Sequence, residues 1–239
     1  MPGSTTTCDT IVTRCQNKLR DTMTGSGAIW DPTTFDGSKW ADAINDAQLD
    51  IYNDIIRYKA WDLCDMLFDS VDITMVVDQE DYDWGVAISG ASKSYYAFVE
   101  AYWGDYRVRV LPRYRYWHLV TGRIQPSIIR PFMVFWGDEY FKLRPKPAET
   151  STTFTFHFVK SLTELDATTE KPQLDERCIP LFYPKILARY WEARRRFELK
   201  IMYDNEDLRN PGEYQKLRKQ ILGPHKRYEL KDLVTVDNA

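Results

Sequence analysis

The sequence predicts an α+β protein in which a helical bundle, formed by N- and C-terminal helices, carries an inserted antiparallel β-rich domain and an extended C-terminal tail. Two observations support this fold class. Apolar residues near both ends recur every three or four positions, as on the buried face of an amphipathic helix. In the middle, apolar and polar residues alternate, as in half-buried strands. We therefore assign residues 1–66 and 173–223 to the bundle, 67–172 to the β-rich domain and 224–239 to the tail.

Two helices are predicted in the N-terminal part. In residues 7–21, Cys8 and Cys15 lie seven positions apart on one face, which favours buried thiols. The 4 Cys of the chain form no CxxC pair, so no disulfide framework is expected and a reducing cytoplasm fits. Residues 37–63 give the strongest helical pattern, with apolar positions Trp40, Ile44, Ala47, Ile51, Ile55 and Tyr58.

The middle of the chain is expected to form strands separated by glycine- and proline-containing turns. The clearest strand is residues 152–159, where Phe154, Phe156 and Phe158 alternate with polar residues and fall on one face. The other predicted strands are residues 71–77, 94–102, 106–111, 114–120, 132–136 and 140–143.

Helices return in the C-terminal part. Residues 181–203 are predicted as one helix whose apolar face contains Ile186, Tyr190, Ala193, Phe197 and Ile201. A short helix follows Gly212 and ends before Pro224. The tail cannot bury its apolar residues by itself and needs a partner surface; these residues are Leu230, Leu233, Val234 and Val236.

Aromatic residues make up 14% of the chain, with 8 Trp and 15 Tyr. Their large apolar area and polar tips suit an interface as well as a core, and both interpretations stay open. No apolar run is long enough to span a bilayer, and the polar N-terminus lacks a signal-peptide pattern, so neither membrane insertion nor export is expected.

Charge is unevenly distributed. Residues 185–231 contain 13 Lys and Arg against 7 Asp and Glu, although the whole chain has a net charge of −3. At helical spacing, one acidic stripe comprises Asp42, Asp46 and Asp50, and one basic stripe comprises Lys185, Arg189, Arg196 and Lys200. Both stripes fit solvated helix faces. A sharper hypothesis pairs the acidic stripe of one subunit with the basic stripe of its neighbour, or turns the acidic stripe toward a DNA channel where it repels phosphates.

The sequence contains no recognisable catalytic, cofactor-binding or metal-binding motif, so we predict a structural protein rather than an enzyme, with no cofactor. The 3 His are scattered and have no metal-ligand spacing. An alternative function is nucleic-acid binding through residues 106–117, where four Arg interleave with Tyr and Trp.

Several segments, in order along the chain, resemble the head-to-tail adaptor (connector, or neck) proteins of tailed bacteriophages. Residues 40–52, WADAINDAQLDIY, are similar to their opening helix with a Trp and an I-N-x-A-Q pattern. Residues 140–147, YFKLRPKP, resemble their strand followed by a P-x-P turn. The strand 154–158, the connector 162–165 and the helix that follows Ile179-Pro180 resemble later parts of these proteins. Residues 78–125 are longer and more aromatic than the family pattern.

The resemblance implies a homo-oligomeric ring, commonly of twelve subunits, in the neck of the virion and made in the host cytoplasm. It implies that the helical body surrounds a channel through which double-stranded DNA passes without sequence-specific contact. It also implies that the C-terminal tail docks on the portal protein and that the β-rich part faces tail or nozzle proteins.

Overall fold

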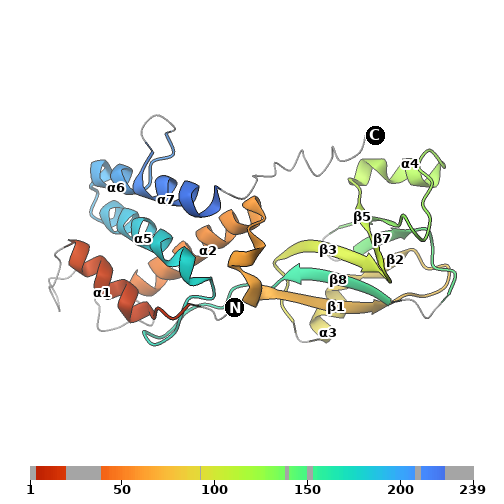
Figure 1. The fold of residues 1–239 in the computed structure, drawn as a ribbon, viewed down its shortest axis with the longest axis horizontal. Coiled ribbons are helices and arrows are strands. Elements are labelled where there is room, and N and C mark those ends of the chain that lie inside the picture. The colour runs from red at the N-terminus through yellow and green to blue at the C-terminus, as the bar shows by residue number, and fades with distance from the viewer. Residues whose placement is uncertain are drawn as a thin grey trace. The chain divides into compact units, whose positions relative to one another are not determined.

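The computed structural model describes residues 4–19, 39–91, 93–137, 140–149, 153–207 and 211–223, and the predicted tail, residues 224–239, lies outside them. The chain divides into two compact units (Figure 1). We call the first the helical unit; it combines the N-terminal part up to Met66 with the part that begins at Leu162. The second, the β-rich unit, contains residues 67–161. Helices together with antiparallel sheets confirm the predicted α+β class.

Helix α5 (Ile179–Ala193) is the centre of the helical unit, because α1 (Cys8–Leu19), α2 (Lys39–Tyr58), α6 (Phe197–Tyr203) and α7 (Glu213–Leu222) all contact it. Three short 3-10 helices complete this part of the chain: η1 (Trp61–Leu63), η2 (Asp65–Leu67) and η4 (Glu176–Cys178). Pro180 lies in the first turn of α5, where proline is tolerated because its missing N–H has no partner inside the helix.

The predicted apolar face of α2 is confirmed, since Ile44, Ala47 and Ile51 have no exposed surface. Its Trp40 stacks on Tyr190 of α5, with ring centroids 6.4 Å apart. All four Cys are buried free thiols, as predicted for Cys8 and Cys15, and burial raises the pKa of each to about 12.

Two four-stranded sheets form the β-rich unit. The first has the order β1 (Phe68–Thr74), β8 (Thr153–Val159), β3 (Ala97–Trp103), β4 (Tyr106–Arg107). The second has the order β2 (Asp81–Asp83), β7 (Tyr140–Arg144), β6 (Phe132–Phe135), β5 (Arg109–Val110). Neighbouring strands are antiparallel except for β5 and β6, which are parallel.

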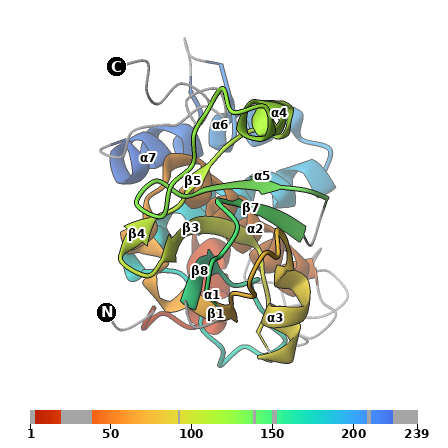
Figure 2. The ribbon, with the colours of Figure 1, turned by 90° about the vertical axis from the view of Figure 1, so that its right-hand side faces the viewer.

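The aromatic residues of the β-rich unit form its core. Phe154, Phe156 and Phe158 of β8 are fully buried, as their alternation predicts, and pack with Phe141 and Leu143 of β7. Helix α4 (Tyr116–Val120) adds a second, smaller core, in which Tyr116 and Leu119 pack against Phe132 and Val134 of β6. Figure 2 shows α4 and α3 (Trp84–Gly90) at different sides of the sheets.

Two short helices form where a strand and a turn were predicted. Residues 114–120 are not a strand but the end of η3 (Arg113–Arg115) and all of α4, because Tyr116 and Leu119, three positions apart, reach the same core. Residues 84–90 form α3 rather than a turn region. The carboxylate of Asp83 caps α3 by accepting a hydrogen bond from the Val86 N–H at 2.9 Å.

The single helix predicted for residues 181–203 is also wrong, because the chain breaks between α5 and α6. Arg195 at the break has a φ of 56°, a left-handed conformation that ends a helix. The break removes Phe197 and Ile201 from the apolar face of α5, and their side chains are 54% and 51% exposed.

Candidate functional site: charged contacts among helices α2, α5 and α7

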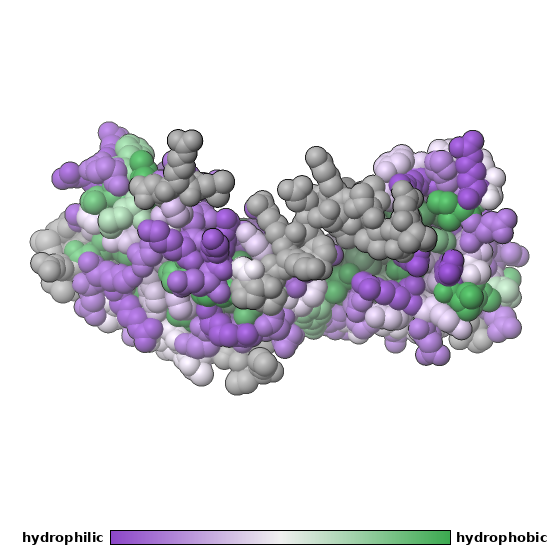
Figure 3. Space-filling model, turned by 45° about the horizontal axis from the view of Figure 1, so that its top comes forward, coloured by the Kyte–Doolittle hydropathy of each residue, from purple (hydrophilic) through white to green (hydrophobic). Residues whose placement is uncertain are grey.

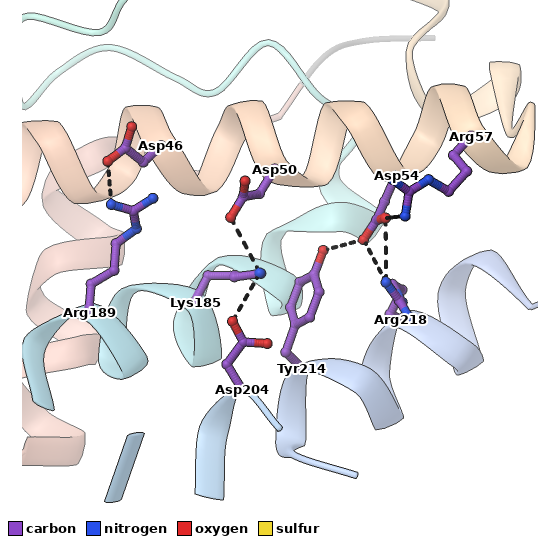
Figure 4. Close-up of polar contacts among 9 residues, drawn as sticks. All are labelled: Asp46, Asp50, Asp54, Arg57, Lys185, Arg189, Asp204, Tyr214 and Arg218. Carbon is purple, nitrogen blue, oxygen red and sulfur yellow. Dashed lines mark hydrogen bonds and ion pairs between the residues drawn. The ribbon is translucent and has the colours of Figure 1, made fainter. Parts of the chain in front are cut away.

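The acidic and basic stripes meet within one chain. Asp46 of α2 forms an ion pair and a hydrogen bond with Arg189 of α5. One turn further along α2, Asp50 lies 3.3 Å from the ammonium of Lys185, also on α5 (Figure 4). One hypothesis from the sequence paired the two stripes between subunits, whereas the structure pairs Asp46 and Asp50 with α5 of the same chain. The reason is that α2 and α5 are neighbours in the same helical unit.

A third carboxylate on the same helix, Asp54, connects α2 to α7. Its side chain accepts a hydrogen bond from the Tyr214 hydroxyl at 2.7 Å and lies 3.3 Å from the Arg218 guanidinium. Asp54 is only 7% exposed and Tyr214 only 1% exposed. Arg57, one turn away on α2, approaches Asp54 at 3.9 Å. We call these contacts of Asp46, Asp50 and Asp54 the charged ladder.

Lys185 joins the ladder to the segment after α6. Its ammonium lies 3.0 Å from the Asp204 carboxylate and 4.3 Å from the ring centre of Tyr214. Burial raises the pKa of the Tyr214 hydroxyl, and the negative charge of Asp54 raises it further. Tyr214 therefore stays a neutral hydrogen-bond donor, and the ladder holds α2, α5 and α7 in one register.

Three predicted stripe residues lie outside the ladder. Asp42 is exposed and forms no ion pair within the part of the chain that the structure describes. Beyond the helix break, Arg196 pairs with Glu198 at 3.5 Å and Lys200 pairs with Glu192 at 2.5 Å. A continuous helix would have aligned Arg196 and Lys200 with Lys185, so the break at Arg195 explains why the basic stripe divides.

Asp54, Tyr214 and Arg218 were missed as a site by sequence reasoning. The available signal was the drift of Asp54 toward the apolar edge of α2, since an acidic residue at such a position needs a buried partner. Tyr214 lies in the short helix predicted after Gly212, where its spacing indicates only an apolar position.

Two amides of α2 hold the segment that returns from the β-rich unit. The Asn45 side chain accepts a hydrogen bond from the Leu165 N–H at 2.9 Å and donates one to the Leu165 carbonyl at 3.2 Å. Gln48, which is 1% exposed, accepts a hydrogen bond from the Gln173 N–H at 2.9 Å. The I-N-x-A-Q pattern thus has a physical role, because its Asn and Gln satisfy backbone groups that would otherwise be buried without partners.

Contacts within the chain involve several residues of the Arg- and aromatic-rich segment 106–117. Tyr116 is buried and bonds to Glu80, Arg113 stacks on Trp136 at 4.2 Å, and Arg107 pairs with Glu100 at 3.4 Å. Tyr114 and Trp117 are each 63% exposed. Structural roles therefore account for much of the pattern that suggested nucleic-acid binding.

The described residues contain no group of His, Cys, Asp or Glu arranged to hold a metal ion. Nor does any described helix have the length and apolar character needed to cross a membrane.

Comparison with known protein families identifies the family of this chain. The sequence matches the family described as SU10 adaptor protein over residues 6–227, a range that includes the charged ladder, the Asn45 and Gln48 contacts and the whole β-rich unit. The chain belongs to this family of bacteriophage adaptor proteins. The resemblance to head-to-tail adaptors is thereby confirmed, and a structural role follows from it. No curated protein matches the chain.

The ladder of this adaptor protein predicts a measurable coupling inside one subunit. Asp46 and Arg189 are both partly exposed, so a double-mutant cycle with Asp46→Ala and Arg189→Ala is expected to give about 0.5 kcal/mol of coupling in the free energy of unfolding. The cycle should be measured by chemical denaturation at protein concentrations that keep the chain monomeric. Coupling that is absent from the monomer and present only in an oligomer would show that the pair forms between subunits. Asp42→Ala combined with Arg189→Ala is the matched control, and additive effects are expected.

Proposed function

We propose that this chain is the subunit of a ring that docks on the portal, connects the capsid to the tail and lets double-stranded DNA pass through its channel. The observation that carries the proposal is the family match over residues 6–227, which spans both units. Family membership implies oligomerisation, contact with portal and tail proteins, and a place in the virion neck. The twelvefold ring and the DNA channel are the further steps of the proposal.

The helical unit suits the wall of such a ring. Its helices are fixed to one another by a buried core and by the charged ladder, so they present a rigid surface. Four of the predicted stripe charges form ion pairs inside the subunit: Asp46 with Arg189 and Asp50 with Lys185. Asp42, Arg196 and Lys200 remain at the surface or in exposed pairs, and we keep them as the proposed channel or inter-subunit charges.

The C-terminal tail is the proposed portal-docking segment, with Leu230, Leu233, Val234 and Val236 as its apolar contacts. The composition supports this role, because a short segment with scattered apolar residues gains most by adding to a partner's surface. The β-rich unit is proposed to face tail or nozzle proteins.

The mass of the purified protein, measured by native mass spectrometry with and without portal rings, tests the proposal. We expect a ring-sized species, at least in the presence of the portal. Deleting residues 225–239 is expected to abolish portal binding and to leave the unfolding midpoint unchanged. A protein that stays monomeric in both conditions would contradict the ring. A deletion variant that binds the portal normally would contradict the docking role of the tail alone.

A further inference from the structure

Acidic and basic residues of the β-rich unit are concentrated in different parts of the sequence. Residues 67–92 contain six Asp and Glu and no Lys or Arg, whereas residues 106–137 contain six Arg and no Asp or Glu. The topology places these parts at different edges of the sheets. The outer strands from the acidic part are β1 and β2, and the outer strands from the basic part are β4 and β5.

Short connections keep the edges of like charge together. Strands β1 and β2 are joined by residues 75–80, and β4 and β5 are separated only by Val108. Hence residues 75–80 join the acidic edge of one sheet to the acidic edge of the other, and the two basic edges, β4 and β5, are adjacent (Figure 2). We call the outer surface of β1, β2 and residues 75–80 the acidic side.

The basic side consists of β4, β5 and the turn 127–130. The turn lies beside β5, because the Arg109 N–H donates a hydrogen bond to the Pro131 carbonyl at 2.9 Å. An isolated bridge between Ser127 and Arg130 closes the turn.

Both sides expose apolar residues beside their charges. On the basic side Ile128 and Ile129 are 56% and 62% exposed, and on the acidic side Val76 and Val77 are each 43% exposed. In Figure 3, hydrophobic patches lie among hydrophilic ones on the surface of the β-rich unit. Apolar groups bordered by charges are typical of protein interfaces, whereas binding to a DNA backbone gains little from Ile or Val.

On each side, some charged residues form no ion pair within the described part of the chain, although Asp72 accepts a hydrogen bond from the Thr155 hydroxyl at 2.8 Å. Arg130 forms no ion pair among the residues that the structure describes, and the same holds for Asp72 and Asp78. By contrast, Asp69 is neutralised by Lys93 and Lys160, and Glu80 by Lys142 and Arg144. The charged residues without an ion pair therefore lie at specific positions on the two sides, while other charged residues of the unit are paired.

We propose that the acidic side of one copy docks against the basic side of the next copy. Such a contact joins unlike surfaces head to tail, and repetition of one head-to-tail contact closes into a ring when the rotation allows it. Val76 and Val77 would meet Ile128 and Ile129, while the charges set the register. This inference rests on the ring proposed above, and it adds a subunit contact in the β-rich unit to the helix-stripe positions that the proposed function retains.

Charge reversal on each side tests the contact. The basic-side variant carries Arg107→Glu and Arg130→Glu, and the acidic-side variant carries Asp72→Lys and Asp78→Lys. Each variant alone is expected to need a subunit concentration about tenfold higher, or more, for assembly, because like charges then face each other. An equal mixture of the two variants, and a chain with all four substitutions, should both assemble again. Lys216→Glu with Lys219→Glu, on the exposed surface of α7, is the control that changes charge equally and leaves assembly unchanged.

Sedimentation velocity, with and without portal rings, gives the outcome. Variants that assemble like the unmodified chain would overturn the contact but not the proposed ring. If the basic-side variant loses DNA binding while its assembly is unchanged, the contact is overturned in the same way. An unmodified chain that forms no ring in either condition would overturn both the contact and the proposed function. If a charge variant fails to fold, Ile129→Gln is used in its place, and unchanged assembly of that variant likewise overturns the contact.

Discussion

Replacing Asp54 by Ala is expected to lower the free energy of unfolding of the helical unit by about 3 kcal/mol. The substitution leaves the Tyr214 hydroxyl buried without an acceptor and the Arg218 guanidinium without its counter-charge. Loss of one partner from a buried ion pair costs more than the pair contributes, because the remaining charge stays desolvated. Chemical denaturation followed by circular dichroism in the helical region measures the effect.

Two matched variants separate the contributions to this loss. Tyr214→Phe removes only the hydroxyl and keeps the contact between Asp54 and Arg218, so a loss of about 1 kcal/mol is expected. Asp42→Ala removes an acidic residue of the same helix that is exposed, and the expected change is within about 0.5 kcal/mol. If Asp54→Ala lowers the free energy of unfolding no more than Asp42→Ala does, then the contact between α2 and α7 contributes little to the stability of the helical unit, contrary to this prediction.

The long periodic segments could be predicted from sequence because one physical requirement dominates each of them. Helix α2 has one face that must be buried over five turns, and β8 alternates from Thr153 to Phe158. Shorter segments carry too few residues for a period to be distinct. Helix α4 has five residues, and its aromatic and β-branched composition favours a strand when read locally. Only its packing against β6 makes it a helix.

The break between α5 and α6 had no Gly or Pro to indicate it. Arg195 adopts the left-handed conformation there, although non-glycine residues do so at a cost of about 1 kcal/mol.

The charged residues of the candidate site could be predicted from the sequence, but the pairs that they form could not. Helical periodicity identified Asp46, Asp50, Lys185 and Arg189 as members of stripes, but periodicity carries no information on whether opposite charges meet within a chain or between chains. That answer depends on α2 and α5 lying side by side, which is a tertiary contact.

Replacing Phe156 by Ala is expected to destabilise the β-rich unit by about 3–5 kcal/mol. Phe156 is fully buried at the centre of an aromatic cluster, with ring centroids 5.1 Å from Phe98 and 5.8 Å from Trp84. Removing the ring leaves a cavity that neighbours from both sheets and from α3 cannot fill together, because each is held by its own strand or helix. Near-ultraviolet circular dichroism follows the loss of packing directly, since the cluster is aromatic.

Phe197→Ala is the matched control for the same chemical change, because that side chain is half exposed on α6, and a change within about 0.5 kcal/mol is expected. Phe156→Leu keeps an apolar side chain in the cluster and should lose less than the Ala variant. The Phe156 cluster lies wholly in the β-rich unit, and the ladder of Asp54 lies wholly in the helical unit. Phe156→Ala is therefore expected to shift the aromatic signal more than the helical signal, and Asp54→Ala to do the reverse. If both variants shift the two signals equally, then the units unfold as one cooperative structure, and a defect in either would weaken the whole adaptor.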